Sequence, residues 1–279
     1  MPQGLALAIG LNSVDPNHYG GWTGDLNACE ADAEDMTEIA KSSHFNVTTL
    51  LTVNATRAKV INEINRAATV LTSGDIFLLT YSGHGGQVPD LNGDEIDDHQ
   101  DETWCLYDGQ LIDDETYSLL GKFTTGVRIL VFSDSCHSGT VTKQAYYQGT
   151  IAARSATPIA SDVKYRYMPN SIALRTYRQN KTFYDPILDN KASKESRAAV
   201  RASVLLISGC QDNQFSSDGT FNGLFTANLL RVWNNGQFQG DYRRFHKSIL
   251  RNMPPDQTPN YFRVGVINSN FEKQLPFSI

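Results

Sequence analysis

Apolar residues follow two rhythms along this chain. Short runs that are apolar through their centres are typical of strands buried on both faces, whereas apolar residues every three or four positions are typical of amphipathic helices. The strand-like runs cover residues 5–10, 46–53, 75–81, 127–133, 203–208 and 261–266, and the helix-like stretches cover 26–40, 57–71, 222–233 and 241–253. Their alternation predicts an α/β fold with a mostly parallel central sheet and helices on both faces.

Two polar residues mark where the first two helices should begin. Asp25 precedes the first helix-like stretch, and Thr56 precedes the second. Side-chain oxygens of Asp and Thr accept hydrogen bonds from the free N–H groups of a first helical turn. We therefore expect both residues to act as N-caps.

Two segments interrupt the alternation. Residues 90–115 contain eleven acidic residues and no Lys or Arg. Residues 140–201 show weak periodicity, and from 154 to 201 they contain ten Lys or Arg against four acidic residues. A stretch of this length without regular structure is usually a functional loop or a linker.

Composition and charge narrow the possible functions. The 279 residues are 40% hydrophobic, enough for a sizeable core, and the net charge of −6 makes nucleic acid an unsuitable partner. No apolar run approaches the roughly 18 residues that span a bilayer, and the start of the chain does not have the pattern of a signal peptide. We expect a monomer in the cytoplasm that makes no membrane contact.

The four cysteines, at positions 29, 105, 136 and 210, include no CxxC pair. A zinc site or a disulfide framework is therefore a poor interpretation, and a single cysteine in a suitable setting is a candidate nucleophile.

Two motifs follow buried strands directly. YSGHGG places His84 just after the run that ends at residue 81, and DSCHSG places Cys136 just after the run that ends at residue 133. Carboxyl ends of neighbouring parallel strands meet at one edge of a sheet, which is where ligands bind in open α/β folds. The two side chains should therefore meet across 52 residues of sequence.

Thiol proteolysis needs this pair. Only the thiolate attacks, so an imidazole must take the proton of Cys136 and later give one to the leaving amine. Backbone N–H groups of Gly85 and Cys136 are suitable donors to the oxyanion, and one such donor is typically worth about 3 kcal/mol of barrier. Alone, Cys136 would more often be a small buried residue and SGHG a tight turn, but the two motifs together favour catalysis.

These motifs, followed by SGCQDNQFSSD and DQTPNYF, resemble those of metacaspases, including the prokaryotic members called orthocaspases. The resemblance covers nearly the whole chain and implies a caspase-hemoglobinase fold, thiol proteolysis and cleavage after a basic residue. It divides the chain into a p20-like region over residues 1–150, a basic linker over 151–200 and a p10-like region over 201–279, together one compact catalytic domain. The QAC[RQG]G signature of true caspases is absent.

The resemblance also assigns a pocket for the basic side chain. The positions that match the pocket in metacaspases are Cys29, Asp32, Ser82 and Asp134. Carboxylates suit a guanidinium because they accept paired hydrogen bonds from it. Alone, Asp32 would be a solvated helix flank and Asp134 a turn cap. After the strand 203–208, Asp212 and either Ser217 or Asp218 are further candidate substrate contacts, although the same residues would suit a plain polar loop.

Calcium activates many metacaspases through four aspartates. Three of the matching positions are Asp101, Asp113 and Asp114, but the fourth is Lys143, whose ammonium could neutralise those carboxylates in place of the cation. The segment that starts at Asp90 has the oxygen spacing of an EF-hand but has Glu95 where Gly is required. We therefore expect no required cofactor, with the three aspartates as residual calcium ligands at most; a solvated acidic loop is the alternative.

The predicted function is a cysteine endopeptidase that cuts protein or peptide substrates after Arg or Lys without requiring calcium. We also expect it to cut itself within residues 140–201, with Arg154 as the first candidate and Arg166, Arg175 and Arg178 as others. A non-catalytic scaffold and a calcium-binding module are the competing classes. The presence of His84 and Cys136 disfavours the first, and Lys143 with Glu95 disfavours the second.

Overall fold

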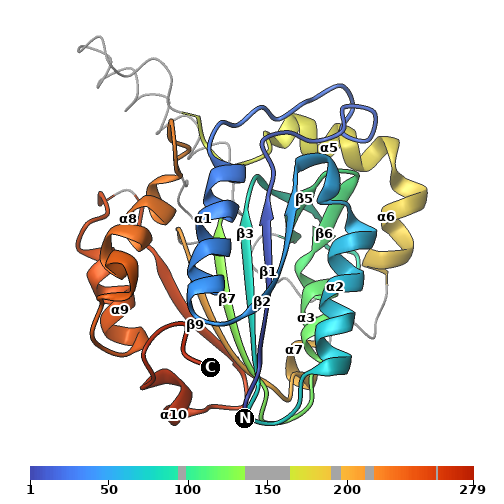
Figure 1. Ribbon diagram of the computed structural model, residues 1–279. Helices are drawn as coiled ribbons and strands as arrows, with labels where there is room; N and C mark the ends of the chain where they lie inside the picture. The colour runs from blue at the N-terminus through green and yellow to red at the C-terminus, as the bar shows by residue number, and fades with distance from the viewer. Residues whose placement is uncertain (94–98, 136–163, 190–195, 211–216, 256) are drawn as a thin grey trace.

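A six-stranded sheet runs through the centre of the computed structural model (Figure 1), which describes residues 1–93, 99–135, 164–189, 196–210, 217–255 and 257–279. Its strand order is β2-β1-β3-β7-β8-β9, and only the last strand is antiparallel. The strands are β1 (Gly4–Gly10), β2 (Asn46–Leu51), β3 (Ile76–Ser82), β7 (Arg128–Asp134), β8 (Ser203–Ser208) and β9 (Asn260–Gly265). Each lies within two residues of a predicted strand, so the mostly parallel sheet is confirmed.

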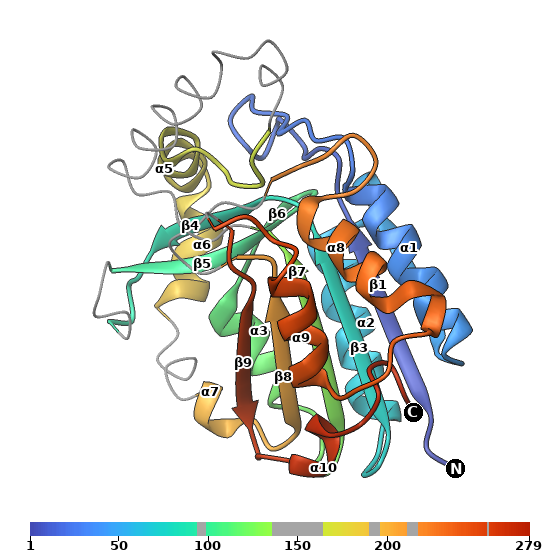
Figure 2. The same ribbon diagram turned by 90° about the vertical axis from the view of Figure 1, so that its left-hand side faces the viewer.

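Helices cover both faces of this sheet (Figures 1 and 2). One layer contains α1 (Cys29–Ser42), α8 (Leu224–Trp233) and α9 (Tyr242–Leu250), and the other contains α2 (Arg57–Val70), α3 (Asp113–Leu120) and α7 (Ser196–Ala199). Successive strand residues point to opposite faces, so Leu78 joins the core under the first layer while Phe77 and Leu79 join the core under the second. This double burial explains why the central strands are apolar at every position.

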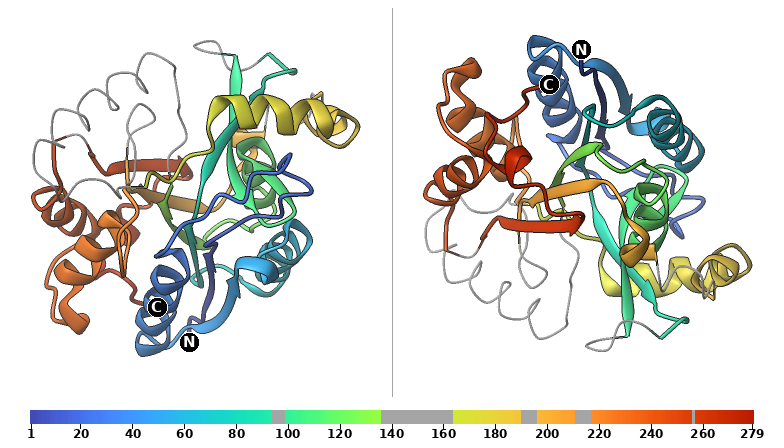
Figure 3. Two further views of the ribbon diagram at one scale, coloured as in Figure 1. Left: turned by 90° about the horizontal axis from the view of Figure 1, so that it is seen from above. Right: turned by 90° about the horizontal axis from the view of Figure 1, so that it is seen from below.

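Viewed along the strands, the layers lie on either side of the sheet, and α5 (Asn170–Gln179) crosses near its carboxyl edge (Figure 3). The helices α5 and α6 (Lys181–Leu188) occupy part of the basic segment that we expected to lack regular structure. That expectation was wrong for residues 170–188. Ala173, Tyr177, Tyr184 and Leu188 form the buried side of these helices, a spacing that the surrounding polar residues obscure.

The acidic segment contributes to a second sheet. Three antiparallel strands, β4 (Gly85–Pro89), β5 (Gln100–Leu106) and β6 (Gly109–Ile112), form it, and α3 follows directly. This sheet was not predicted from the sequence, because its strands are short and contain many polar residues. Its first residue is Gly85, so the sheet starts at the predicted catalytic motif.

The remaining elements of the described residues are short: η1 (Thr52–Asn54), η3 (Asn234–Gly236) and α10 (Ser269–Glu272). Among the residues that the structure describes, no helix is long and apolar enough to cross a membrane.

The two predicted N-caps have different outcomes. The Thr56 side chain accepts a hydrogen bond from the Lys59 N–H, as expected. Asp25 does not cap α1, which begins only at Cys29. Instead, Asn12 Oδ1 accepts hydrogen bonds from the N–H groups of Cys29 (2.9 Å) and Glu30 (3.3 Å). Asn12, from the loop after β1, therefore caps α1 in place of Asp25. Sequence spacing alone cannot reveal a cap that comes from another loop.

Candidate active site

The two predicted catalytic motifs leave neighbouring strands at the same edge of the sheet. β3 pairs with β7 in parallel, and Ser82 lies opposite Asp134 in the register. His84 therefore follows one strand by two residues, and Cys136 follows the other by two. Cys136 itself lies outside the described residues, but Ser135 is described and is fully buried. The predicted neighbourhood of the two strand ends is confirmed.

The segment between β1 and α1 holds the ring of His84. Its Nε2 lies 2.9 Å from the carbonyl oxygen of Gly24, and its ring lies 4.7 Å from that of Trp22 between centroids. A carbonyl oxygen only accepts, so Nε2 carries the proton in the neutral ring and Nδ1 carries the lone pair. Nδ1 is buried and has no hydrogen bond of ordinary geometry to any described residue. The ring is therefore fixed in the tautomer that can accept a proton at Nδ1.

Burial lowers the pKa of His84 to about 4. The Arg166 cation contributes to this net lowering, while hydrogen bonds to the backbone of Gly24 and of Tyr167 and the charge of Asp218 oppose it. The imidazole is accordingly neutral at physiological pH, the form that a general base requires.

The loop that carries His84 is anchored by a buried tyrosine. Tyr81 Oη donates to the carbonyl oxygens of His84 (2.7 Å) and Cys105 (3.1 Å), and the Cys105 N–H donates to the His84 carbonyl (2.9 Å). These bonds fix the carbonyl group of His84 against β5. The orientation of His84 therefore depends on β5 as well as on β3.

A cage of carboxylates lies beside this histidine. Asp32 on α1, Asp134 at the end of β7 and Asp218 all contact one guanidinium, that of Arg166, at 2.7, 2.9 and 2.9 Å. Arg166 Nη1 also donates to Ser82 Oγ at 2.8 Å, and Ser82 Oγ donates to Asp32 at 2.7 Å. Arg166 is fully buried. The predicted positions Asp32, Ser82 and Asp134 thus form one site around a basic side chain, and Asp218 joins them.

The loop before α8 supplies a wall that the sequence analysis did not identify. Gly223 N–H donates to both oxygens of Asp32 (3.0 and 3.3 Å), and Asn222 Nδ2 donates to one of them at 3.0 Å. A Cβ on Gly223 would lie 2.5 Å from the Arg166 guanidinium carbon and from both of its terminal nitrogens. Thr226 hydrogen-bonds Asp134 through its N–H and its hydroxyl. Proximity of this loop to the SGCQDNQFSSD motif was the only signal in the sequence.

The other predicted contacts are placed as follows. Cys29 is buried next to Ser82, and burial raises the pKa of the thiol. Ser217 contributes backbone rather than its side chain, in an isolated antiparallel bridge to Tyr165. Asp212 lies outside the described residues.

Comparison with known proteins now identifies the family. A model of the Caspase domain matches residues 3–276. The chain belongs to the caspase-domain family. It is 28% identical to Metacaspase-1 of Schizosaccharomyces pombe over 80% of this chain and 57% of that protein, and 29% identical to Metacaspase-1 of Saccharomyces cerevisiae over 77% and 53%. The chain thus spans about half the length of these curated relatives.

A solved structure agrees over the full length. The crystal structure of protein GSU0716 from Geobacter sulfurreducens is 60% identical, covers 99% of both chains and superposes with a TM-score of 0.88. The resemblance to metacaspases and the caspase-hemoglobinase fold are therefore confirmed.

The predicted calcium ligands of this caspase-domain chain lie in the acidic segment. Asp101 is buried on β5, and Asp113 and Asp114 open α3, where Asp114 accepts a hydrogen bond from Asn92 at 2.7 Å. Within the described ranges no three His, Cys, Asp or Glu side chains gather closely enough to hold a metal ion. Lys143 lies outside those ranges, so the exchange of a cation for its ammonium stays a prediction.

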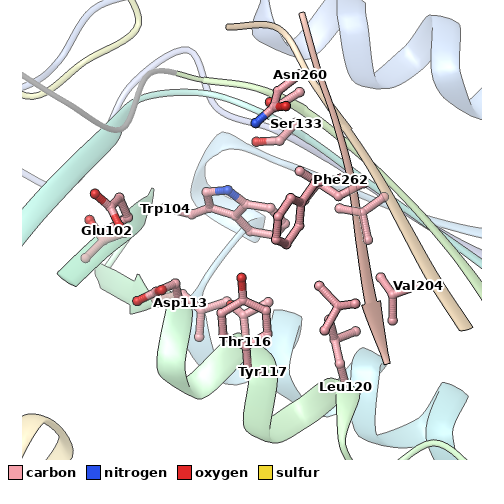
Figure 4. Close-up of a pocket in the computed structure, with 16 residues that line it drawn as sticks. Glu102, Trp104, Asp113, Thr116, Tyr117, Leu120, Ser133, Val204, Asn260 and Phe262 are labelled. Atoms are coloured by element: carbon pink, nitrogen blue, oxygen red, sulfur yellow. The ribbon is translucent and has the colours of Figure 1, made fainter. Parts of the chain in front are cut away.

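A separate cavity of about 320 Å³ lies between the second sheet, α3 and β7–β9. Trp104, Tyr117, Leu120 and Phe262 line it, with Glu102 and Asp113 at one side (Figure 4). None of the 16 described residues that line it is Cys or His. The described lining therefore offers no thiol or imidazole for proteolysis, and the candidate active site is the edge where His84 and the carboxylates meet.

Proposed function

We propose that this caspase-domain chain is a cysteine endopeptidase that hydrolyses peptide bonds after Arg or Lys. In this proposal Cys136 is the nucleophile, His84 is the acid and base, and the Gly85 N–H binds the oxyanion. Substrates are proteins or peptides, with the chain acting as a cytoplasmic monomer.

The single observation that carries the basic specificity is the cage around Arg166. The buried carboxylates of Asp32 and Asp218 and Ser82 Oγ accept hydrogen bonds from one guanidinium, which also forms an ion pair with the buried Asp134 carboxylate at 2.9 Å. Burying a charge is costly unless it is paired, and three acidic groups together need a cation. An acidic side chain in the same place would meet like charges, so cleavage after Asp is disfavoured.

The geometry of His84 supports its two roles. Its Nδ1 lone pair can accept the thiol proton of Cys136, which generates the attacking thiolate. The resulting imidazolium can then protonate the leaving amine. The hydrogen bond from Nε2 to Gly24 keeps the ring in place through both steps.

The test is hydrolysis of small Arg-, Lys- and Asp-amide substrates by the wild-type chain, Cys136→Ala and His84→Ala. We expect turnover after Arg and Lys, none after Asp, and a loss of more than about 10³-fold in both variants, because nucleophile and base act as a unit. Cys210→Ala is the matched control, since that thiol is buried and donates to the Ser135 carbonyl. Turnover that survives Cys136→Ala, or a dominant preference for Asp, would refute the proposal.

Two further properties belong to the same proposal. Activity should not require calcium, because Lys143 can supply the positive charge that Asp101, Asp113 and Asp114 need. The chain should also process itself within residues 140–201. Arg154, the first candidate from the sequence, lies outside the described residues; Arg175 and Arg178 lie on α5, and a helix does not present the extended backbone that a protease cleft binds.

A further inference from the structure

The Arg166 side chain occupies the carboxylate cage as the basic side chain of a substrate would. It comes from the segment that joins the two halves of the chain, where an arginine would normally remain in water. Instead it is fully buried, and its Nε and both Nη atoms donate to Asp218, Ser82 and Asp32. The pocket is filled, since the hollow that remains beside Asp32 and Asp134 has a volume of only about 10 Å³.

The backbone is held on both sides of Arg166, by an isolated antiparallel bridge from Tyr165 to Ser217 and an isolated parallel bridge from Tyr167 to Gly85. On one side, Gly85 N–H donates to the Arg166 carbonyl (3.0 Å), and the Met168 N–H donates back to the Gly85 carbonyl (2.7 Å). On the other, the Asp218 N–H donates to the Lys164 carbonyl (2.8 Å). A segment that pairs with exposed backbone in this way is bound as a peptide substrate is bound, by strand addition.

The register places one peptide bond at the predicted chemistry. The carbonyl of Arg166 is held by the N–H group expected to stabilise the oxyanion, and the next residue is Tyr167. The backbone of Tyr167 raises the pKa of His84, so the group near the ring is an acceptor, the Tyr167 carbonyl oxygen, and Nδ1 is the ring atom without another hydrogen bond among the described residues. The nitrogen that would leave belongs to the same residue, so the acid lies next to the residue whose amide is released.

We propose that the Arg166–Tyr167 bond is an intramolecular substrate of this site, which blocks the cleft of the uncut chain and is cut by the chain itself. This inference rests on the proposed function and adds to it the bond, the register and the autoinhibition. It replaces Arg154 with Arg166 as the first processing position.

The reaction balances without any cofactor. His84 takes the thiol proton, the Cys136 thiolate adds to the Arg166 carbonyl carbon, and the bond to the Tyr167 nitrogen breaks as His84 returns the proton to that nitrogen. The products are a thioester at Arg166 and a free amino group at Tyr167. Water then adds its oxygen to the thioester carbonyl, one of its protons passes through His84 to the sulfur, the other is released to solvent, and Arg166 leaves as a carboxylate.

The two ends of the cut are held differently. Met168 is buried in a small core with Val14, Tyr19, Cys105 and Ala173, so the new amino terminus stays attached to the body of the molecule. The Arg166 side is held by the cage and by the Lys164 contact. Cleavage makes Arg166 a chain end, which can leave the pocket and open it to other basic substrates.

The test follows intact mass and amino-terminal sequence of the purified full chain during incubation, together with hydrolysis of a small Arg-amide. Wild type should yield a fragment that begins at Tyr167, and its Arg-amide activity should rise tenfold or more as that fragment accumulates. The first-order rate of the cut should not change on dilution, because the bond lies in its own cleft. Cys136→Ala should stay intact, even when mixed with active wild type.

Two variants separate cleavage of the Arg166–Tyr167 bond from occupation of the pocket by Arg166. Tyr167→Pro keeps Arg166 in the cage but has no ordinary amide to release, so it should stay intact at this bond and at least tenfold slower on the Arg-amide than incubated wild type. Arg166→Gln empties the cage and should show full Arg-amide activity without a lag. Arg166→Lys keeps the charge and should be cut like wild type, which guards against a folding failure in the glutamine variant. Arg175→Gln, exposed on α5, is the matched control.

The outcomes distinguish this inference from the proposed function. If wild type reaches full Arg-amide activity while the Arg166–Tyr167 bond stays intact, the chain is a protease and the inference is wrong. The inference would also be wrong if Arg175→Gln hydrolysed the Arg-amide without the initial lag. It would be wrong, too, if cleavage at Arg154 activated Arg166→Gln and wild type to the same extent. If the Arg-amide is never hydrolysed under any condition, the proposed function fails and takes the inference with it.

Discussion

Replacing Gly223 with alanine tests the basic pocket through sterics alone. The backbone of Gly223 has φ −60° and ψ 151°, which alanine adopts without strain. The added methyl carbon would lie 2.5 Å from three atoms of the Arg166 guanidinium, whereas an ordinary carbon contact is about 3.5 Å. A bound arginine must therefore retreat by about 1 Å.

The effect of this shift on catalysis can be estimated from the hydrogen bonds that it breaks. The guanidinium makes its bonds to Asp32 and Asp218 at 2.7 and 2.9 Å, and a shift of about 1 Å takes both beyond hydrogen-bonding distance. Each bond to a charged group contributes about 1.5–3 kcal/mol, and part of that loss is recovered by relaxation. We expect kcat/KM for Arg substrates to fall about 100-fold, the loss that a misplacement of about 1 Å typically causes.

Gly223→Ala should lower kcat/KM less for Lys substrates than for Arg substrates. Its side chain ends in one nitrogen near the position of the guanidinium carbon and lacks both terminal nitrogens, so two of the three close contacts disappear. The readout is therefore the ratio of kcat/KM for matched Arg- and Lys-amides. This ratio does not depend on how many molecules have an open cleft, so it is unaffected by self-processing.

The control is Gly121→Ala at the end of α3, where a Cβ would meet no atom closer than 3.4 Å. It should leave the Arg/Lys ratio at the wild-type value, while Gly223→Ala should lower it about tenfold or more. An unchanged ratio in Gly223→Ala, in a chain that still turns over Arg substrates, would show that the cage around Arg166 is not the pocket that recognises substrates.

Three further predictions concern charge. Asp32→Asn keeps the shape of the cage but removes one of its charges, so kcat/KM for Arg-amides should fall more than about tenfold. The pKa of His84 should stay near 4 when it is measured by NMR in a Cys136→Ala background. Equal kcat/KM values for Asp32→Asn and wild type would exclude Asp32 from the pocket. Because burial lowers the pKa of His84 from 6.5 to about 4, the unfolded chain binds a proton between these values and the folded chain does not, so the free energy of unfolding should fall by about 3 kcal/mol as the pH drops from 7 to 4. His84→Asn should lose that part of the slope in denaturant titrations, and an identical slope would refute the assignment. Activity should be the same in excess chelator and in millimolar calcium, and Lys143→Asp should make it sensitive to calcium; a wild-type loss in chelator that calcium restores would refute this.

The central sheet and the location of the site could be predicted from the amino-acid sequence. Runs such as 75–81 and 203–208 are apolar at every position because both faces of these strands are covered by helices, and only buried strands combine that composition with that length. His84 could be located from its motif because a residue just past a parallel strand must lie at the carboxyl edge of the sheet, whatever packs around it. Asp32, Ser82 and Asp134 followed from the resemblance to metacaspases.

Only the tertiary structure decided how that edge is completed. Asn12 caps α1 from another loop, the Gly24 carbonyl selects the tautomer of His84, and Gly223 walls the pocket from more than 180 residues further along the chain than Asp32. Above all, Arg166 was one basic residue among ten in its segment. Nothing in its neighbourhood distinguishes it, because its burial depends on three carboxylates that come from α1, β7 and the segment before α8. Charge pairing between residues so far apart in sequence arises only in the folded chain, so the local sequence around Arg166 does not predict it.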